Sequence, residues 1–204
     1  MRKPKLREIK EALRSFFSRP YTSKFPRAAV VPPPGFRGRP RYSREDCVGC
    51  KACAEVCPAK AIDVEDVQVS KGVGFRRLTH RYDVCIYCGQ CEKACITEKG
   101  ITLSLEWELS GVARADMTDI VEKDLLFCEL CNAPITCIDH IKWIAKKVGL
   151  MAYTNPTIFL TRHKDDLKII PQLTKRDEKA VSRGDQMRIT CPSCRREILF
   201  TEAW

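Results

Sequence analysis

The sequence contains no uninterrupted apolar run that approaches the roughly 20 residues needed to cross a bilayer as a helix. Its N-terminus, MRKPKLREIKEALRSFF, lacks the continuous apolar core of a secretory signal peptide. It also lacks a Gly-rich phosphate loop, a nucleophile elbow and a recognisable catalytic pair of carboxylates. We therefore expect a protein that does not span a membrane, although it could lie on one, and that has no substrate site of its own.

What the sequence does have is cysteine, 13 residues in a chain of 204. Cysteine is abundant either in secreted disulfide scaffolds or in metal-binding proteins. The missing signal sequence and the odd number of cysteines both argue against disulfide pairing. The cysteines therefore predict metal ligation in a reducing compartment.

The net charge of +10 is concentrated at the N-terminus. Residues 1–44 contain 13 Lys and Arg against two acidic residues, whereas residues 45–204 contain 23 basic and 24 acidic residues. A nucleic-acid-binding protein more often carries its positive charge on the folded surface. The body of this chain is neutral, so we expect no nucleic-acid partner, although a nucleic-acid-binding iron–sulfur and zinc protein is the alternative from another functional class.

The basic N-terminal arm begins with a predicted amphipathic helix over residues 4–19, which Pro20 would end. Its apolar residues recur at helical spacing and share one face. They are Leu6, Ile9, Leu13, Phe16 and Phe17. Residues 20–44 are rich in Pro, Gly and Arg, so we expect them to be extended. An apolar stripe beside basic residues suits a membrane surface, and an ordinary helix packed on this chain's own core is the other interpretation.

Residues 45–109 contain an internal repeat in which a cysteine loop, a short helix and a strand follow one another. The spacing C-x2-C-x2-C-x3-C occurs in CVGCKACAEVC and again in CIYCGQCEKAC. This spacing is that of bacterial two-cluster ferredoxins, in which the fourth cysteine of each motif ligates the other cluster. Between the copies, residues 66–83 predict a hairpin that turns at residues 71–74.

The repeat predicts two [4Fe–4S] clusters with exchanged ligands. Cluster A is assigned to one loop and the last cysteine of the other motif, namely Cys47, Cys50, Cys53 and Cys95. Cluster B is assigned in the same way to Cys85, Cys88, Cys91 and Cys57. Two tetrahedral zinc sites are the alternative, but zinc knuckles are paired cysteines separated by a longer gap. Pro58 fits the iron–sulfur motif, whereas Ile96 stands where proline is usual.

Residues 110–204 carry a second and sparser set of cysteines. Two C-x2-C knuckles, FCELC and TCPSC, supply Cys128, Cys131, Cys191 and Cys194, which are enough for one tetrahedral site. Structural zinc is favoured, and mononuclear rubredoxin-like iron, a third cluster and free thiols remain open. Cys137 is left over and is counted as a spare thiol, with a ligand that replaces one of these four cysteines as the alternative.

The elements of this C-terminal region are less clearly predicted. Residues 119–126 and 138–148 show helical periodicity, residues 157–161 and 198–201 could be strands, and residues 164–185 read as a charged loop. The three histidines and three tryptophans are scattered, so ordinary packing and surface roles are expected. They are His80, His140, His163, Trp107, Trp143 and Trp204.

Residues 1–109 resemble the two-cluster ferredoxin-like subunit shared by respiratory complex I and membrane-bound group 4 [NiFe] hydrogenases. The resemblance rests on the amphipathic arm, on RPYTSKFP, on GFRGRPRYS, on the paired motifs CVGCKACAEVCP and CIYCGQCEKAC, and on ITLSLEWEL. The tail, FCELCNAPI followed distantly by CPSCRRE, is similar to that of the formate hydrogenlyase and related hydrogenase subunits.

This resemblance implies an electron-transfer subunit rather than a catalytic one. Electrons would pass from a donor iron–sulfur subunit through clusters A and B to the small subunit of a [NiFe] hydrogenase, beside its large subunit and membrane arm subunits. The chain would lie peripherally on the cytoplasmic side of the cell membrane. A ferredoxin-like subunit of a complex I-type quinone oxidoreductase is the alternative.

The predicted fold class is α+β, a ferredoxin-type core with two [4Fe–4S] clusters. We expect three regions: a basic helix and extended arm over 1–44, the two-cluster domain over 45–109, and a zinc-ribbon or rubredoxin-like extension over 110–204.

Overall fold

The computed structural model describes residues 5–19, 22, 25, 27–111, 113–163 and 183–200. The chain divides into two compact units, Met1–Phe36 and Arg37–Trp204, which are described separately below. No helix in these described ranges is long and apolar enough to cross a membrane.

The first unit contains the predicted amphipathic helix, α1 (Leu6–Phe17). The backbone N–H of Lys5 donates to the Glu8 carboxylate at 3.0 Å, which stabilises the first turn. None of the helix residues is buried, and the side chain of Phe16 is 82% exposed. The predicted helix is confirmed, and the residues of its apolar stripe are exposed.

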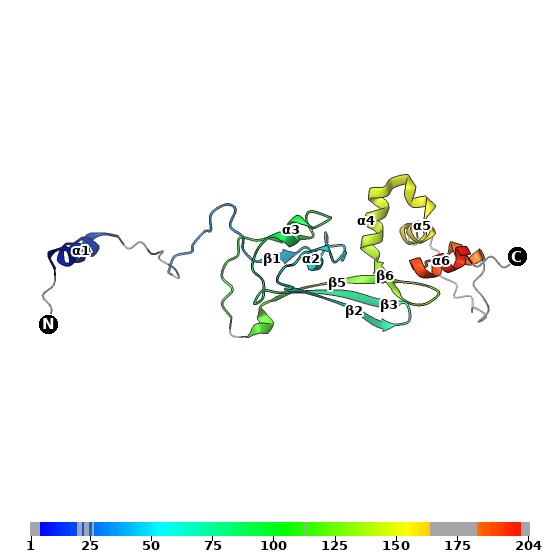
Figure 1. Ribbon diagram of the computed structural model, residues 1–204, viewed down its shortest axis with the longest axis horizontal. Helices are drawn as coiled ribbons and strands as arrows, with labels where there is room; N and C mark the ends of the chain where they lie inside the picture. The colour runs from blue at the N-terminus through cyan, green and yellow to red at the C-terminus, as the bar shows by residue number, and fades with distance from the viewer. Residues whose placement is uncertain are drawn as a thin grey trace. The chain divides into compact units, whose positions relative to one another are not determined.

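The second unit is a mixed α/β assembly built on two antiparallel sheets. In chain order, it contains β1 (Pro40–Tyr42), α2 (Ala52–Glu55), β2 (Ile62–Ser70), β3 (Val73–Arg81), α3 (Gln90–Lys93), β4 (Ile101–Leu103), η1 (Arg114–Asp116), β5 (Thr118–Phe127), β6 (Pro134–Cys137), α4 (Ile138–Val148), η2 (Gly149–Thr154), α5 (Pro156–His163), η3 (Arg183–Met187) and α6 (Pro192–Phe200). Figure 1 shows α2 and α3 together on one side of the larger sheet.

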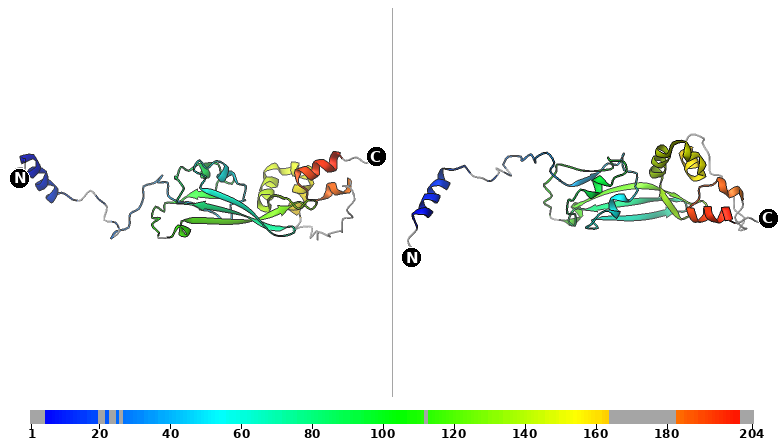
Figure 2. Two further views of the ribbon diagram at one scale, coloured as in Figure 1. Left: turned by 60° about the horizontal axis from the view of Figure 1, so that its bottom comes forward. Right: turned by 45° about the horizontal axis from the view of Figure 1, so that its top comes forward.

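The larger sheet has the strand order β2-β3-β5-β6 (Figure 2). The predicted hairpin forms one side of this sheet: β2 is the edge strand and pairs with β3, and the chain turns at Lys71 and Gly72. β5 pairs antiparallel with the other edge of β3, so a strand from the C-terminal region continues the hairpin sheet. The smaller sheet pairs β1 with β4, which ties the segment before the first cysteine loop to the segment after the second.

Alternate residues of β3 face the cysteine loops, because successive side chains of a strand point to opposite faces of the sheet. The four buried residues are Gly74, Arg76, Leu78 and His80. Leu78 packs with Val121 of β5 and Cys47 of the first loop. The sheet therefore provides the floor beneath the cysteine-rich region.

The C-terminal region differs from the sequence expectation at three elements. Residues 119–126 lie in strand β5 rather than in a helix, because this segment pairs with β3, a partner distant in sequence. Residues 157–161 lie in helix α5 and residues 198–200 in helix α6, not in strands. Both helices begin with proline, which is favoured at the first helical position.

One further expectation for this region is confirmed, and another falls mostly outside the described residues. Helix α4 confirms the periodicity over 138–148. The expected charged loop falls mostly on residues 164–182, which lie outside the described residues, as does Trp204.

A partly buried ion pair, in which Arg76 is buried and Asp66 is not, joins the hairpin to the first cysteine loop. The guanidinium of Arg76 donates to both carboxylate oxygens of Asp66, at 2.6 and 2.9 Å, and to the carbonyl of Gly49 at 2.8 Å. Hydrogen bonding from Arg76, set against partial burial, lowers the pKa of Asp66. One arginine therefore holds two strands and a loop in register.

We predict that Arg76→Met lowers the free energy of unfolding by about 2 kcal/mol, because it removes the charge-assisted hydrogen bonds to the Asp66 carboxylate and the hydrogen bond to the Gly49 carbonyl. The neighbouring Arg77 pairs with Glu122 in an exposed bridge, so Arg77→Met is the matched control and should cost less than about 1 kcal/mol. Anaerobic chemical denaturation of both variants measures the difference. Equal losses of unfolding free energy in the two variants would show that the Arg76–Asp66 bridge contributes no more than the exposed Arg77–Glu122 bridge.

Candidate iron–sulfur and metal sites

The two cysteine motifs have the same backbone path. Three residues in each copy take a positive φ, and they stand at the same offsets from the first cysteine of each motif. The two loops therefore share one backbone geometry. They are Gly49, Lys51 and Lys60 in the first copy and Tyr87, Gly89 and Glu98 in the second. Helices α2 and α3 follow the loops and carry the third cysteine of each motif, Cys53 and Cys91. The internal repeat predicted from the sequence is thus a structural repeat.

One cavity, called cavity B, is lined by cysteines from both motifs. They are Cys85, Cys88 and Cys91 from the second loop and Cys57 from the end of the first motif. Ile62, His80 and Ile86 complete much of its wall. The lining is almost entirely apolar apart from the thiols and the histidine, as suits a group held by sulfur ligands.

A second cavity, called cavity A, has the complementary set. Cys47, Cys50 and Cys53 come from the first loop, and Cys95 comes from the end of the second motif. Tyr42 and Leu78 also line it. Each grouping is the one that exchanged ligation requires.

Burial keeps several of these thiols protonated in the absence of a metal. It raises the pKa of Cys53 to about 12 and that of Cys91 to about 11. Iron–sulfur clusters bind thiolates, so loading a cluster must displace these protons. The positive charge of the irons stabilises thiolates that burial alone would destabilise. The donor set therefore fits two clusters.

The four knuckle cysteines of the tail also come together, although 59 residues lie between Cys131 and Cys191 in the sequence.

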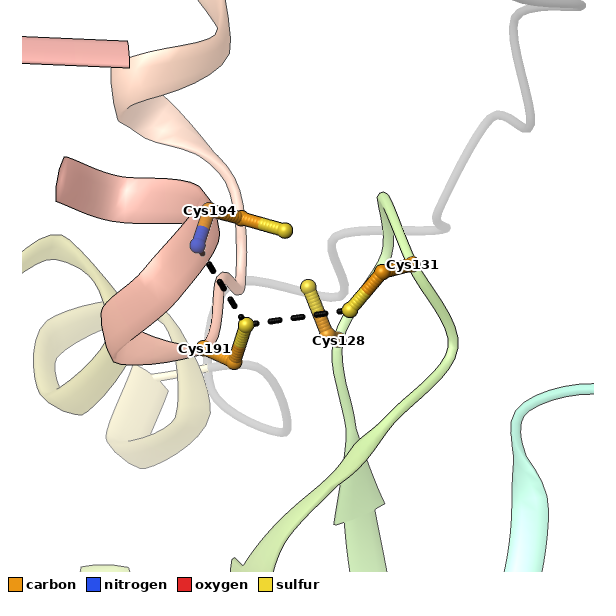
Figure 3. A group of neighbouring side chains, drawn as sticks. All are labelled: Cys128, Cys131, Cys191 and Cys194. Carbon is orange, nitrogen blue, oxygen red and sulfur yellow. Dashed lines mark hydrogen bonds between the residues drawn. The ribbon is translucent and has the colours of Figure 1, made fainter. Parts of the chain in front are cut away.

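 Their Sγ atoms all lie within 4.8 Å of one another, and those of Cys131 and Cys191 are 3.7 Å apart (Figure 3). Four thiolates at the zinc–sulfur distance of about 2.3 Å would stand roughly 3.8 Å apart around a single tetrahedral ion. The arrangement therefore fits one ion, either zinc or iron. A cubane cluster needs more widely spaced ligands.

Two elements present these four cysteines. Cys128 follows β5 and Cys131 lies in the turn before β6, whereas Cys191 precedes α6 and Cys194 lies within it. The backbone N–H of Glu129 donates to the carbonyl of Ile189 at 2.9 Å, which joins the two knuckles directly. Burial raises the pKa of Cys128, but backbone N–H groups outweigh it and lower the value to about 7. At least one thiolate ligand is thus available near neutral pH.

Cys137 lies outside this group, as the sequence suggested, but it is not an idle thiol. It is fully buried, and its Sγ lies 3.5 Å from the carbonyl oxygen of Gly49. A Cβ atom at position 49 would come within 2.5 Å of this Sγ, and the φ of Gly49 is +68°. Glycine is therefore required at this position by its conformation and by Cys137.

Sequence reasoning missed two residues of the cavity walls, Tyr42 and His80. The Tyr42 hydroxyl lies 3.8 Å from Cys53 Sγ in cavity A, and His80 lines cavity B. Burial lowers the pKa of His80 to about 4, so the imidazole is neutral. The signal that could have found His80 is its place in the inward register of β3. His140, by contrast, bonds Thr136 and lines neither cavity.

Comparison with known proteins gives a consistent assignment for the cysteine-rich region. A family model described as a 4Fe-4S dicluster domain matches residues 46–99. Formate hydrogenlyase subunit 6 of Escherichia coli is 29% identical over 170 residues, which cover 83% of this chain and 88% of that protein. A solved chain of the membrane-bound sulfane sulfur reductase, an archaeal respiratory membrane complex, is 25% identical, with a TM-score of 0.41 over 57% of this chain and 61% of that chain.

The quinone oxidoreductases provide the match that decides the family. NAD(P)H-quinone oxidoreductase subunit I of Gloeobacter violaceus is 31% identical over 101 residues, 48% of each chain. NADH-quinone oxidoreductase subunit I 2 of Geobacter metallireducens is 31% identical over 128 residues, which cover 59% of this chain and 95% of that protein. The resemblance expected from the cysteine motifs and the arm is confirmed, and the chain belongs to the iron–sulfur subunit family of NADH-quinone oxidoreductase subunit I.

Proposed function

We propose that this chain carries electrons through two [4Fe–4S] clusters as a peripheral subunit of a membrane-bound complex of the formate hydrogenlyase type. The observation that carries the proposal is the pair of cavities, each lined by three cysteines of one motif and the fourth cysteine of the other. Iron–sulfur clusters supply the one-electron redox chemistry, and the chain supplies their ligands, their spacing and their apolar shielding.

The lining of the two cavities supports the ligand assignment. Cluster A is held by Cys47, Cys50, Cys53 and Cys95, and cluster B by Cys85, Cys88, Cys91 and Cys57. The two sites adjoin, because Cys53 and Cys91 belong to one buried cluster of side chains with Ile62 and Ile101. Neighbouring clusters suit electron transfer by hopping from one to the next.

The tail favours the hydrogenase-type complex over the quinone oxidoreductase. The alignment with formate hydrogenlyase subunit 6 spans 170 residues, so it must extend well beyond residue 109 into the tail that carries the knuckle cysteines. A complex I-type quinone oxidoreductase remains the second candidate, because the identity to subunit I is of the same order. The partners in the first case are the small and large [NiFe] subunits, an electron-donor iron–sulfur subunit and membrane arm subunits.

The chain's three regions have separate roles in this proposal. Residues 1–44 attach the subunit to the cytoplasmic face of the membrane or to a membrane subunit, through the exposed apolar stripe of α1 and its basic residues. Residues 45–109 hold the two clusters. Residues 110–204 form a zinc-ribbon or rubredoxin-like extension, in which Cys128, Cys131, Cys191 and Cys194 bind one zinc or iron ion.

The cluster assignment predicts about eight irons and eight acid-labile sulfides per chain in anaerobically purified protein, with interacting reduced-cluster signals in EPR. Cys95→Ser should alter the cluster held by the loop of Cys47, whereas Cys57→Ser should alter the other one. Metal and sulfide analysis with EPR makes the measurement. Zinc without sulfide would end this assignment, and damage confined to each motif's own loop would end the exchange.

For the tail, Cys191→Ser should lower the thermal unfolding midpoint by several degrees and release one ion per chain, because the metal joins the β5–β6 turn to α6. The EPR signals of clusters A and B should be unchanged. The exposed Ser193, in the same helix, supplies the control, since Ser193→Ala keeps every ligand. If Cys191→Ser removed a redox-active signal without loss of stability, the ion would be an iron centre on the electron path.

For the arm, the double variant Leu13→Ser and Phe16→Ser should greatly reduce the amount of this chain recovered with membranes, because it interrupts the apolar stripe. Glu11→Ser with Ser15→Ala changes the opposite face and should leave recovery unchanged. Membrane fractionation at low and high salt measures both.

The complex recovered with the wild-type chain should contain nickel, and a nickel-free complex with quinone reductase activity would favour the second candidate.

A further inference from the structure

His80 is a buried polar residue with an unusual position. It lies on the inward face of β3, opposite Ile62 of β2, and only 1% of its surface is exposed. Its side chain lines cavity B together with Cys57, Cys85 and Cys91. An imidazole at this position therefore faces the space that holds four cysteine side chains.

Neither ring nitrogen of His80 has a hydrogen-bond partner among the described residues. Two neighbouring polar groups are engaged elsewhere: the Tyr82 hydroxyl donates to the carbonyl of Pro40 at 2.6 Å, and the carboxylate of Asp119, the residue opposite His80 on β5, accepts from the backbone N–H of Tyr42 at 2.9 Å. The rings of Tyr42 and Tyr82 lie 6.3 and 5.2 Å from the imidazole. Buried polar groups are nearly always paired, so a partner for His80 is expected inside the cavity.

We propose that His80 donates an N–H hydrogen bond to a sulfur atom of cluster B and thereby raises the reduction potential of that cluster. This inference rests on the proposed function, in which cluster B occupies cavity B. A reduced cluster carries more negative charge on its sulfurs than an oxidised one, so a hydrogen-bond donor stabilises the reduced form more strongly. His80 thus tunes the potential of a cluster whose four ligands are cysteines.

The size of the effect is bounded by the strength of one neutral hydrogen bond. Loss of such a bond changes the equilibrium for one-electron reduction by up to about tenfold. A tenfold change corresponds to about 59 mV for a one-electron couple. The potential of cluster B should therefore fall by up to this amount when the donor is removed, while that of cluster A should not change.

The test uses the full chain in its complex, loaded with clusters and titrated under anaerobic conditions while EPR is recorded. His80→Phe and His80→Leu remove the donor and keep the site apolar. His80→Asn and His80→Gln place an amide N–H near the two ring-nitrogen positions, so one of them should restore the potential. His140→Phe is the matched control, because this half-buried histidine lines neither cavity. Tyr42→Phe identifies the signal of cluster A, since it removes the hydroxyl beside Cys53.

Iron and sulfide content is measured first, so that failure of the proposed function is separated from failure of this inference. Absence of a cluster from wild-type cavity B would overturn the proposed function. With both clusters present, a lower potential for one cluster in His80→Phe and His80→Leu, its recovery in an amide variant and loss of an exchangeable proton coupling support the inference. Unchanged potentials, equal shifts of both clusters, or amide variants that behave as His80→Phe does would overturn it.

Discussion

The hydrogen bond from the Arg76 guanidinium to the carbonyl of Gly49 joins segments of the chain that are far apart in the sequence. Arg76 lies on β3 and is fixed by Asp66 of β2, while Gly49 lies between the first two cysteines of the first loop. The same carbonyl oxygen is approached by Cys137 at the end of β6. The hairpin, the first cysteine loop and the C-terminal region therefore meet at one peptide group, and the geometry of cavity A depends on that contact.

This contact explains why the C-terminal region cannot be a loosely attached addition. β5 extends the hairpin sheet along β3, and Val121 of β5 packs with Leu78 and Cys47. Lys123 of the same strand donates to the carbonyl of Arg44 at 2.6 Å, just before the first cysteine. Two of the four knuckle cysteines, Cys128 and Cys131, follow directly from this strand, so a metal there would hold the far end of an element whose near end supports cavity A.

The cysteine-rich half could be predicted from the sequence because its information is local. Evenly spaced cysteines define their own loops, and the hairpin residues alternate between two environments within one segment. The C-terminal half could not, because its elements depend on distant partners. The apolar residues of β5 fit a helix as well as a strand until β3 is present to pair with them. The β-branched residues of α5 suggested a strand, although Asn155 and Pro156 before them mark a helix start.

The residues that line the two cavities could not be predicted from the sequence for the same reason. A histidine in a strand has many ordinary roles, and the sequence does not state that His80 shares an environment with Cys57 and Cys85. That knowledge requires the sheet, the loop and the exchange of the fourth cysteines together. Cys137 is similar, because its close fit against Gly49 links positions 88 residues apart.

The exchange of cysteines between the two motifs also bears on how the subunit is made. Neither motif, folded alone, encloses a cavity with four cysteines, since each cavity takes its last cysteine from the other copy. A ribosome must therefore have released both copies before either site is complete, and a chain truncated between them offers no finished site to the assembly machinery. The two cysteine sets are therefore completed together, once the second motif has joined the first.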